Sequence, residues 1–324
     1  MKLEQIGFYT LSDRRAATAS ETSPLSRCEL LLTDRCNFRC PYCRRIGGPD
    51  MEYGQAARTV RLWSLEGLKA IRFSGGEPTL HPWLPKLVRL ARESGVERVA
   101  VSTNGSARWA VYEGLLAAGA DDFSVSLDAC CAEDGDRMAG GVKGAWERVV
   151  ANVRRLSARA YTTVGVVLTP DNAAAVEGIV RFADGLGVSD IRVIPAAQAG
   201  DRLCRVDVDA ALLDRHPILR YRAGNIAEGR PVRGLGEGDP DRCGLAMDDM
   251  AVMGDDHYPC IIYLREGGKP IGKVDYGMRA ERARWSGEHD THADPICRRN
   301  CLDVCVDYNR KYASRSSNRA CSTG

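Results

Sequence analysis

Short apolar runs alternate with longer amphipathic stretches between residues 27 and 200. The runs are Cys28–Leu32, Ala70–Phe73, Val96–Val101, Phe123–Leu127, Val164–Leu168 and Ile191–Ile194. Between them, Leu84–Ser94, Ala107–Ala118, Gly144–Ala158 and Ala173–Gly187 carry apolar residues at spacings of three and four, which is typical of helices. Six strands alternating with helices predict parallel β/α units with right-handed crossovers. This periodicity is compatible with an open doubly wound sheet and with a partial barrel.

The rest of the chain divides by composition. Residues 1–26 precede the first apolar run and form an N-terminal extension. Residues 27–221 form the predicted α/β core, and the glycine- and charge-rich segment 222–242 is predicted to be a linker. Residues 243–324 form a predicted small cysteine-rich domain, whose basic, serine-rich end from Asn309 onward is expected to be frayed.

Composition narrows the class of protein. The chain has 324 residues, of which 44% are hydrophobic and 27% charged, and its net charge is +2. These values exclude a disordered chain and give no electrostatic reason to expect nucleic acid or an anionic membrane as partner. The charged N-terminus predicts no secretory signal, and no apolar run approaches the roughly 18 residues that span a bilayer. We therefore expect a cytoplasmic protein with reduced thiols.

Thirteen cysteines in such a chain need another explanation than disulfides, and metal binding is the first candidate. Cys36, Cys40 and Cys43 form a CxxxCxxC pattern directly after the first predicted strand. Three thiolates can hold three irons of a [4Fe–4S] cluster, which leaves one iron open for a ligand from outside the protein. Neighbouring arginines at 35, 39, 44 and 45 are expected to lower the pKa of these thiols. The alternative is a zinc knuckle with a distant fourth ligand.

This pattern, with Tyr42 before the third cysteine, resembles the signature of the radical S-adenosylmethionine (radical SAM) superfamily. Three further motifs follow in order at predicted strand ends: Ser74-Gly75-Gly76-Glu77-Pro78, Ser102-Thr103-Asn104-Gly105 and Ser124-Val125-Ser126-Leu127-Asp128. The resemblance implies a partial (β/α)6 TIM-like barrel. It also implies that SAM binds through the open iron and is cleaved to a 5′-deoxyadenosyl radical, which abstracts hydrogen from the substrate. The SAM-binding residues that it implies are Tyr42, Gly75, Gly76, Glu77, Asn104, Ser126 and Asp128.

A second cysteine group lies at Cys243, Cys260, Cys297, Cys301 and Cys305. It resembles the SPASM or twitch extension of radical SAM enzymes, which implies one auxiliary [4Fe–4S] cluster. Cys243 and Cys260 are the firmest predicted ligands, completed by two of Cys297, Cys301 and Cys305, with Cys321 as a further candidate. The two CxxxC steps depart from the usual CxxC of that extension and leave the last pair open. A structural zinc site is the alternative, and His257 is expected to pack in a hairpin rather than bind metal.

Other thiols have less defined roles. Cys130 and Cys131 follow the fourth predicted strand, where a thiol could donate hydrogen to a substrate radical or be a small buried hydrophobe. Cys204 is a weaker candidate for the same role. Cys28 is expected to pack in its strand, and Cys321 to be a free surface thiol.

The leading functional hypothesis is a radical SAM oxidoreductase that dehydrogenates a small sugar or aminocyclitol intermediate of natural-product biosynthesis. The alternatives are an epimerase with a cysteine hydrogen donor, an enzyme that matures ribosomal peptides and, from another class, a non-catalytic iron–sulfur or zinc protein. The expected partners are a small-molecule substrate and an external electron donor such as flavodoxin or ferredoxin. Neither nucleic acid nor a membrane is expected as a partner.

Overall fold

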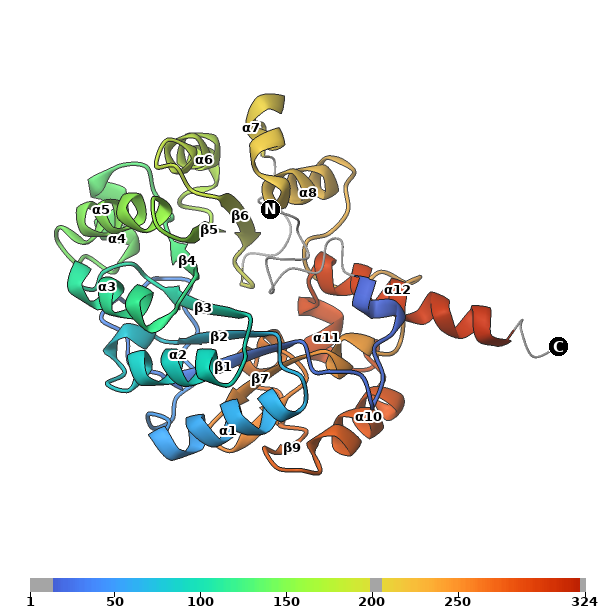
Figure 1. Cartoon of the computed structure of the whole chain (residues 1–324). Coiled ribbons are helices and arrows are strands. Elements are labelled where there is room, and N and C mark those ends of the chain that lie inside the picture. Colours follow the sequence, from blue (N-terminus) through green and yellow to red (C-terminus); the bar gives the residue numbers. More distant parts are fainter. Residues whose placement is uncertain (1–13, 199–205, 321–324) are drawn as a thin grey trace.

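One curved sheet organises the molecule. The computed structural model describes residues 14–198 and 206–320, and the side chains up to residue 314. The nine strands follow the order β6-β5-β4-β3-β2-β1-β7-β8-β9 (Figure 1). The strands are β1 Arg27–Thr33, β2 Ala70–Gly75, β3 Arg98–Thr103, β4 Asp122–Ser126, β5 Tyr161–Leu168, β6 Asp190–Pro195, β7 Asp249–Met253, β8 Asp256–Tyr258 and β9 Gly272–Lys273. Strands β1 to β6 pair in parallel, which confirms the predicted α/β partial barrel.

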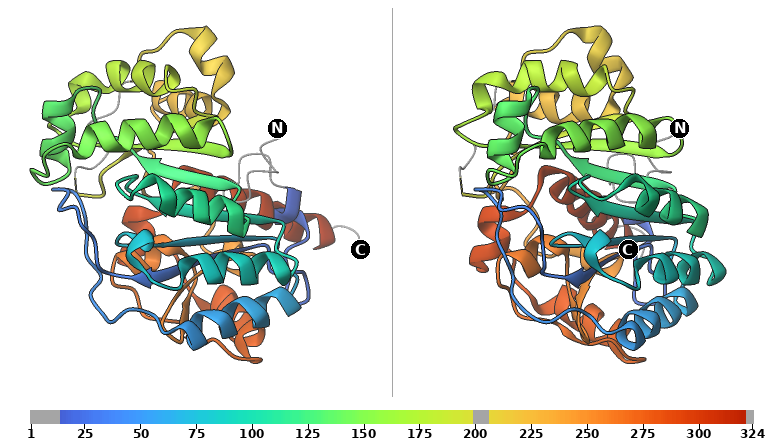
Figure 2. Two further views of the ribbon diagram at one scale, coloured as in Figure 1. Left: turned by 60° about the vertical axis from the view of Figure 1, so that its left-hand side comes forward. Right: turned by 90° about the vertical axis from the view of Figure 1, so that its left-hand side faces the viewer.

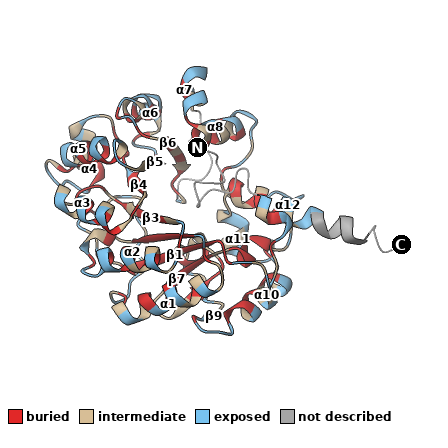
Figure 3. Ribbon diagram, viewed as in Figure 1, coloured by how far each residue is buried: buried red, intermediate tan, exposed pale blue. Residues whose placement is uncertain are grey.

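Helices cover the convex face of the parallel strands (Figures 1 and 2). They are α1 Tyr53–Leu65, α2 Leu84–Glu93, α3 Trp109–Ala118, α4 Ala132–Met138, α5 Ala145–Ser157 and α6 Val176–Asp184. Short 3-10 turns lie at η2 Arg14–Ala17, η3 Pro78–Leu80, η4 Ala173–Ala175 and η6 Gly244–Met247. Figure 3 shows the buried residues concentrated on the strands and on the helix faces that pack against them.

The two faces of the strands differ in chemistry. On β1, Cys28, Leu30 and Leu32 are fully buried in the main hydrophobic core, whereas the alternate residues Arg27 and Glu29 line a cavity inside the barrel. The same alternation recurs on β2 and β4, whose cavity-facing residues are arginine and serine. Because successive side chains of a strand point to opposite faces, the helices bury the apolar set and the barrel interior stays polar.

The C-terminal region continues this sheet and closes its open side. Strand β7 pairs in parallel with β1, and β8 returns antiparallel to β7. The remaining helices are α7 Ala210–Arg215, α8 Pro217–Ala227, α9 Ile261–Arg265, α10 Met278–Glu288, α11 Pro295–Asn300 and α12 Asp303–Ala320. Helix α8 packs against β6, and an isolated bridge joins Arg233 to Leu302 just before α12.

The structure differs from the sequence-based expectation in two segments. The segment 222–242 is not a linker throughout, because its first residues complete α8 and bury Arg222 and Asn225. The expected frayed end beyond Asn309 continues α12, whose first half packs on η6 and η2. Glycine and charge counts do not record the contacts that α8 and α12 make with distant parts of the chain. Residues 321–324 lie outside the described ranges.

Candidate active site

The predicted SAM motifs meet in one cavity at the carboxyl ends of the parallel strands. The cavity has a volume of about 450 Å³. Among its lining residues are the predicted ligands Cys36, Cys40, Cys43, Tyr42, Gly75, Gly76, Asn104, Ser126 and Asp128. Ligands of β/α folds collect at this end of the strands, because the strand-to-helix loops supply side chains there. The folded chain thus brings together residues that are up to 92 positions apart in the sequence.

The loop that carries the first three cysteines is fixed by polar contacts along its length. Arg35 Nη2 lies 2.5 Å from Asp50 Oδ2, and the amide of Cys43 donates to the carbonyl of Cys40 at 3.0 Å. The Tyr42 hydroxyl donates to Asp128 Oδ2 at 2.5 Å, which ties the loop to the end of β4. These contacts hold the thiols of the loop toward one side of the cavity.

Two thiols of this loop have raised pKa values, contrary to the expectation from the neighbouring arginines. Burial raises the pKa of Cys36, and it raises the pKa of Cys40 to about 12. Arg35 is drawn away by Asp50, and Arg44 pairs with Glu266. The prediction that arginines lower these pKa values is therefore wrong for Cys36 and Cys40. Buried thiols of this kind become thiolates when a metal centre supplies the positive charge.

Gly75 and Gly76 lie directly against the cysteine loop. Gly75 has φ +136°, and a Cβ there would lie 2.2 Å from the carbonyl oxygen of Thr33. A Cβ on Gly76 would lie 2.4 Å from the carbonyl oxygen of Arg35. Only glycine allows this approach, so the spacing between the second strand and the loop depends on both residues.

The Glu77 side chain joins two motifs and does not face the cavity. It is fully buried, and its Oε2 accepts from the amide of Asn104 at 2.6 Å. Its other oxygen accepts from the hydroxyls of Thr79 and Thr103 at 2.6 and 2.7 Å. Burial raises the pKa of Glu77 against these hydrogen bonds. The carboxylate therefore fastens the third motif to the second, and Glu77 does not line the cavity.

The other predicted SAM-binding side chains differ in what they offer. Asp128 is buried, accepts from the amide of Val167 at 2.7 Å and from Tyr42, and its pKa is raised to about 6 by burial. Asn104 donates to Asn37 Oδ1 at 2.9 Å. Ser126 is exposed to the cavity at the end of β4. Ser126 is thus open to a ligand, whereas Asp128 holds the site in shape.

All five cysteines of the second group line one small cavity of about 40 Å³, together with Trp285. They come from the start of η6, the start of α9, both ends of α11 and the first turn of α12. Cys260 and Cys305 also line the main cavity, so the two cavities share a wall. Burial raises the pKa of Cys243 to about 11 and also raises the pKa of Cys260 well above its ordinary value.

The spacing of the described cysteine sulfurs differs from that of a tetrahedral zinc site. Among the described residues, ligand atoms lie within 4.8 Å of one another in one group of three, His289, Asp294 and Cys297. No three cysteine sulfurs lie that close, although tetrahedral zinc requires sulfurs about 3.8 Å apart. Among the described residues, neither cysteine group therefore has the sulfur spacing of a tetrahedral zinc site.

The predicted hydrogen donors lie elsewhere. Cys130 packs against the core, and Gly178 of α6 lies beside its sulfur. Cys131 is exposed at the start of α4, where its Sγ lies 3.2 Å from Asp134 Oδ2. Neither lines the main cavity, because the chain turns away from the barrel after Asp128. Cys204 and Cys321 lie outside the described residues, and Cys28 is buried in β1 as predicted.

Comparison with known proteins identifies the family. The sequence model of the Radical SAM superfamily matches residues 30–183. GTP 3′,8-cyclase 1 of Pseudomonas aeruginosa is 30% identical over 225 residues, which cover 63% of this chain and 67% of the relative. The chain belongs to the radical SAM superfamily. It is therefore a radical SAM enzyme.

Further relatives are matched over part of their length, and two solved structures share the fold. The probable GTP 3′,8-cyclase of Metallosphaera sedula is 29% identical over 55% of this chain and 57% of its own length, and the GTP 3′,8-cyclase of Chlorobaculum tepidum is matched over 32% of its length. The structure is similar in fold to anSMEcpe with bound AdoMet (TM-score 0.60, 14% identity, 93% of this chain and 99% of that one). It also resembles SuiB of Streptococcus suis (TM-score 0.59, 15% identity, 85% and 67%).

The predicted cofactors follow from this membership. Radical SAM enzymes use SAM and a [4Fe–4S] cluster, and the cofactors here include one auxiliary [4Fe–4S] cluster. That the second cysteine group binds the auxiliary cluster stays a prediction. Cys36, Cys40 and Cys43 all line the main cavity, and Gly75 and Gly76 pack closely against their loop, which fits the first pair of groups. None of the helices in the described ranges is both long and apolar enough to cross a membrane.

Proposed function

We propose that this radical SAM enzyme acts on a small molecule bound in the barrel, between the SAM site and an auxiliary iron–sulfur site. One observation carries the proposal: sulfurs of both cysteine groups line the same cavity. The lining includes Cys36, Cys40 and Cys43 of the first group and Cys260 and Cys305 of the second. A substrate in this cavity would lie within reach of both sites.

The cofactors and the residues of the chain have different roles in this proposal. When bound, the SAM cluster supplies a 5′-deoxyadenosyl radical that abstracts hydrogen, and the auxiliary cluster supplies a site that can exchange an electron. Gly75 and Gly76 let the second strand pack closely against the loop, and the Tyr42–Asp128 hydrogen bond fixes the loop against β4. The enclosing strands keep water from the radical. We assign the ligands of the auxiliary cluster to Cys243, Cys260 and two of the three cysteines of α11 and α12.

Two reactions remain as candidates. The relatives named GTP 3′,8-cyclase support a rearrangement of a nucleotide. The auxiliary donors in the cavity wall support oxidation of a substrate radical, as in the dehydrogenation that the sequence suggests. Epimerisation has less support, because Cys130 and Cys131 do not line the cavity. Cys204, the weaker candidate donor, lies outside the described residues. An external reductant such as flavodoxin or ferredoxin remains part of the proposal.

The enzymatic proposal is tested by SAM cleavage. Anaerobically reconstituted protein with dithionite and SAM should yield 5′-deoxyadenosine, and replacing Cys36, Cys40 or Cys43 by Ala should abolish the product. Cys131→Ala is the matched control, because its thiol is exposed and outside the cavity. Absence of 5′-deoxyadenosine from wild-type protein with full iron content would refute the proposal.

The mass and the deuterium content of the product distinguish the candidate reactions. With GTP as substrate, a cyclase gives an isomer of GTP of unchanged mass, whereas a dehydrogenase gives a product two hydrogens lighter than its substrate. An epimerase run in D2O places deuterium on the product carbon through an exchangeable thiol. If Cys130→Ala and Cys131→Ala both keep such labelling, neither cysteine is the donor.

A further inference from the structure

The first turn of α12 lies between the two cavities. Leu302, Val304 and Cys305 line the main cavity, and Cys305 also lines the small cavity of the second cysteine group. Because this turn forms part of both walls, its orientation decides where the Cys305 thiol points. It thereby decides how a metal centre in the small cavity would lie relative to a substrate in the main one.

Cys305 is the central thiol of the second cysteine group. The thiol of Cys301 is hydrogen-bonded to Cys305, which together with burial raises the pKa of Cys301. Burial raises the pKa of the other three thiols, and the negative charge of Cys305 adds to the rise in each of Cys243, Cys260 and Cys297. The Cys305 sulfur thus interacts with all four other thiols of the group, and a cluster bound by this group would lie against it.

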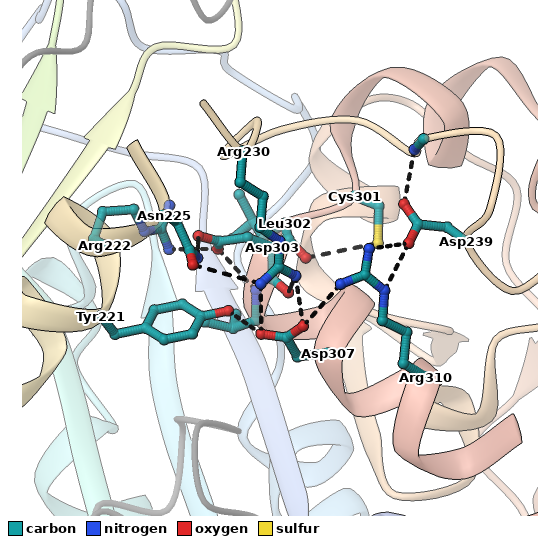
Figure 4. Close-up of polar contacts among 12 residues, drawn as sticks. Tyr221, Arg222, Asn225, Arg230, Asp239, Cys301, Leu302, Asp303, Asp307 and Arg310 are labelled. Carbon is teal, nitrogen blue, oxygen red and sulfur yellow. Dashed lines mark hydrogen bonds and ion pairs between the residues drawn. The ribbon is translucent and has the colours of Figure 1, made fainter. Parts of the chain in front are cut away.

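The buried aspartate at the start of α12 anchors this turn to α8 (Figure 4). The Asp303 side chain is fully buried, and its Oδ1 lies 3.0 Å from Arg222 Nη2. Its Oδ2 accepts from Asn225 Nδ2 at 2.7 Å, and its amide donates to the carbonyl of Val232 at 3.1 Å. Arg222 and Asn225 both belong to α8, which packs against β6. The first residue of α12 is therefore fixed to a helix of the barrel wall.

A second aspartate repeats this anchoring one turn further along α12 (Figure 4). Asp307 Oδ1 lies 2.5 Å from Arg230 Nη2, and Asp307 Oδ2 accepts from Arg230 Nη1 at 3.0 Å. The hydroxyl of Tyr221, on α8, also donates to Asp307 Oδ2. Arg230 Nη2 donates in addition to the carbonyl of Asp303 at 3.3 Å. The two anchors therefore form one network between α12 and the segment that contains α8.

The two aspartates fix the rotation of α12 about its axis. With about 3.6 residues per turn, Asp303 and Asp307 share one side of the helix, and Cys305, midway between them in the sequence, lies on roughly the opposite side. A guanidinium that binds both oxygens of a carboxylate fixes its direction as well as its distance. Rotation of α12 would break the contacts of both aspartates, so these contacts hold the Cys305 sulfur in its direction.

We propose that Asp303 and Asp307 are positioning residues that hold Cys305 as a ligand of the auxiliary cluster. The proposal rests on the proposed function, because it needs the auxiliary cluster at the second cysteine group. Residues that orient a metal ligand typically change metal affinity by about tenfold to a hundredfold when they are replaced. Since Arg222 lines the main cavity and binds Asp303, the network joins the wall of the substrate cavity to a ligand of the cluster.

The auxiliary cluster can be observed alone in full-length protein with alanine at Cys36, Cys40 and Cys43, reconstituted anaerobically. In this background, Asp307→Ala should change the g values of the EPR signal of the dithionite-reduced cluster. It should also lose half of its iron at a chelator concentration about tenfold to a hundredfold lower than the background protein requires. Tyr221→Phe, which removes one hydroxyl and no charge, should change the same EPR signal to a smaller extent.

Asp184→Ala is the matched control, because Asp184 makes similar contacts far from the cysteines in the sequence. Its two oxygens accept from Arg215 at 3.0 and 2.8 Å, and its Oδ1 lies 2.9 Å from His216 Nε2. Its side chain is 26% exposed, against 22% for Asp307, and it belongs to α6. Both variants should lose similar stability, but only Asp307→Ala should change the EPR signal and the retention of iron.

The outcomes separate the positioning role from the proposed function. A background protein that binds no [4Fe–4S] cluster would refute the auxiliary site of the proposed function. A background protein that binds the cluster, with an unchanged EPR signal and unchanged iron retention in Asp307→Ala, would refute the positioning role alone. Equal changes in Asp307→Ala and Asp184→Ala would also refute it, because a general loss of stability would then explain both.

Discussion

Adding one methyl group at Gly76 should disable the SAM site while the rest of the barrel stays folded. In the structure, a Cβ at this position would lie 2.4 Å from the carbonyl oxygen of Arg35 and 2.7 Å from that of Asp34. Ordinary contacts begin near 3.4 Å, so the loop must withdraw by about 1 Å. The loop backbone cannot yield as a flexible side chain does, because the amide of Glu77 is bonded to the Arg35 carbonyl at 2.8 Å.

The magnitude follows from this displacement. Cys36 is the residue next to Arg35, so a withdrawn loop moves the first cluster ligand away from Gly76. A misplacement of about 1 Å can lower a rate about a hundredfold, and overpacking costs about 1–3 kcal/mol of stability. We expect Gly76→Ala to form 5′-deoxyadenosine about a hundredfold more slowly than wild type, with a moderately lower melting temperature.

Gly114→Ala is the control for this variant. Gly114 lies in α3 with nothing within 4 Å of the added Cβ, so alanine should stabilise the helix by about 0.5–1 kcal/mol. Single-turnover formation of 5′-deoxyadenosine, normalised to iron content, measures both variants. A Gly76→Ala enzyme as fast as the Gly114→Ala enzyme would refute the inferred contact between the second motif and the loop.

Two further predictions concern stability. Burial, aided by the charge of Arg282, lowers the pKa of His257 to about 3, and Arg282 donates to its Nδ1 at 3.1 Å. The imidazole of the unfolded chain therefore binds a proton as the pH falls below about 6.5, whereas that of the folded chain stays neutral. Lowering the pH from 7 to 5.5 should reduce the free energy of unfolding of wild type by about 1 kcal/mol through this group. Denaturation of His257→Asn at both pH values should lack this loss. Asp303→Asn leaves the buried Arg222 charge without an acid and should lower the free energy of unfolding by about 3–5 kcal/mol, so an unchanged denaturation midpoint would contradict the role of that pair.

The sequence was a good guide where the signal was local. Apolar runs predicted six of the seven strands that pair in parallel, β1 to β6. Each of the four motifs at their ends supplies residues that line the cavity, although Glu77 does not. The apolar periodicity did not predict helix α1, although Glu52 and Gln55 form a capping box at its start. That local signal could have revealed it.

Other features depend on contacts that no short pattern contains. The pairing of β7 with β1 joins residues more than 200 positions apart. The burial of Arg222 arises from the docking of α8 between β6 and α12. The glycine-rich residues that follow Arg222 led to its prediction as part of a linker. The turn of the chain after Asp128 decides that Cys130 and Cys131 leave the cavity, and proximity in sequence suggested the reverse.

The central claim is that two iron–sulfur sites lie on one substrate cavity, and metal analysis tests it most directly. Anaerobically reconstituted wild-type protein should contain two [4Fe–4S] clusters, that is, about eight irons and eight sulfides per chain, without zinc. The variant with alanine at Cys36, Cys40 and Cys43 should keep about four irons, and the Cys243→Ala/Cys260→Ala variant should keep the other four. Wild-type protein with only four irons, or with zinc bound by the second group, would contradict the account.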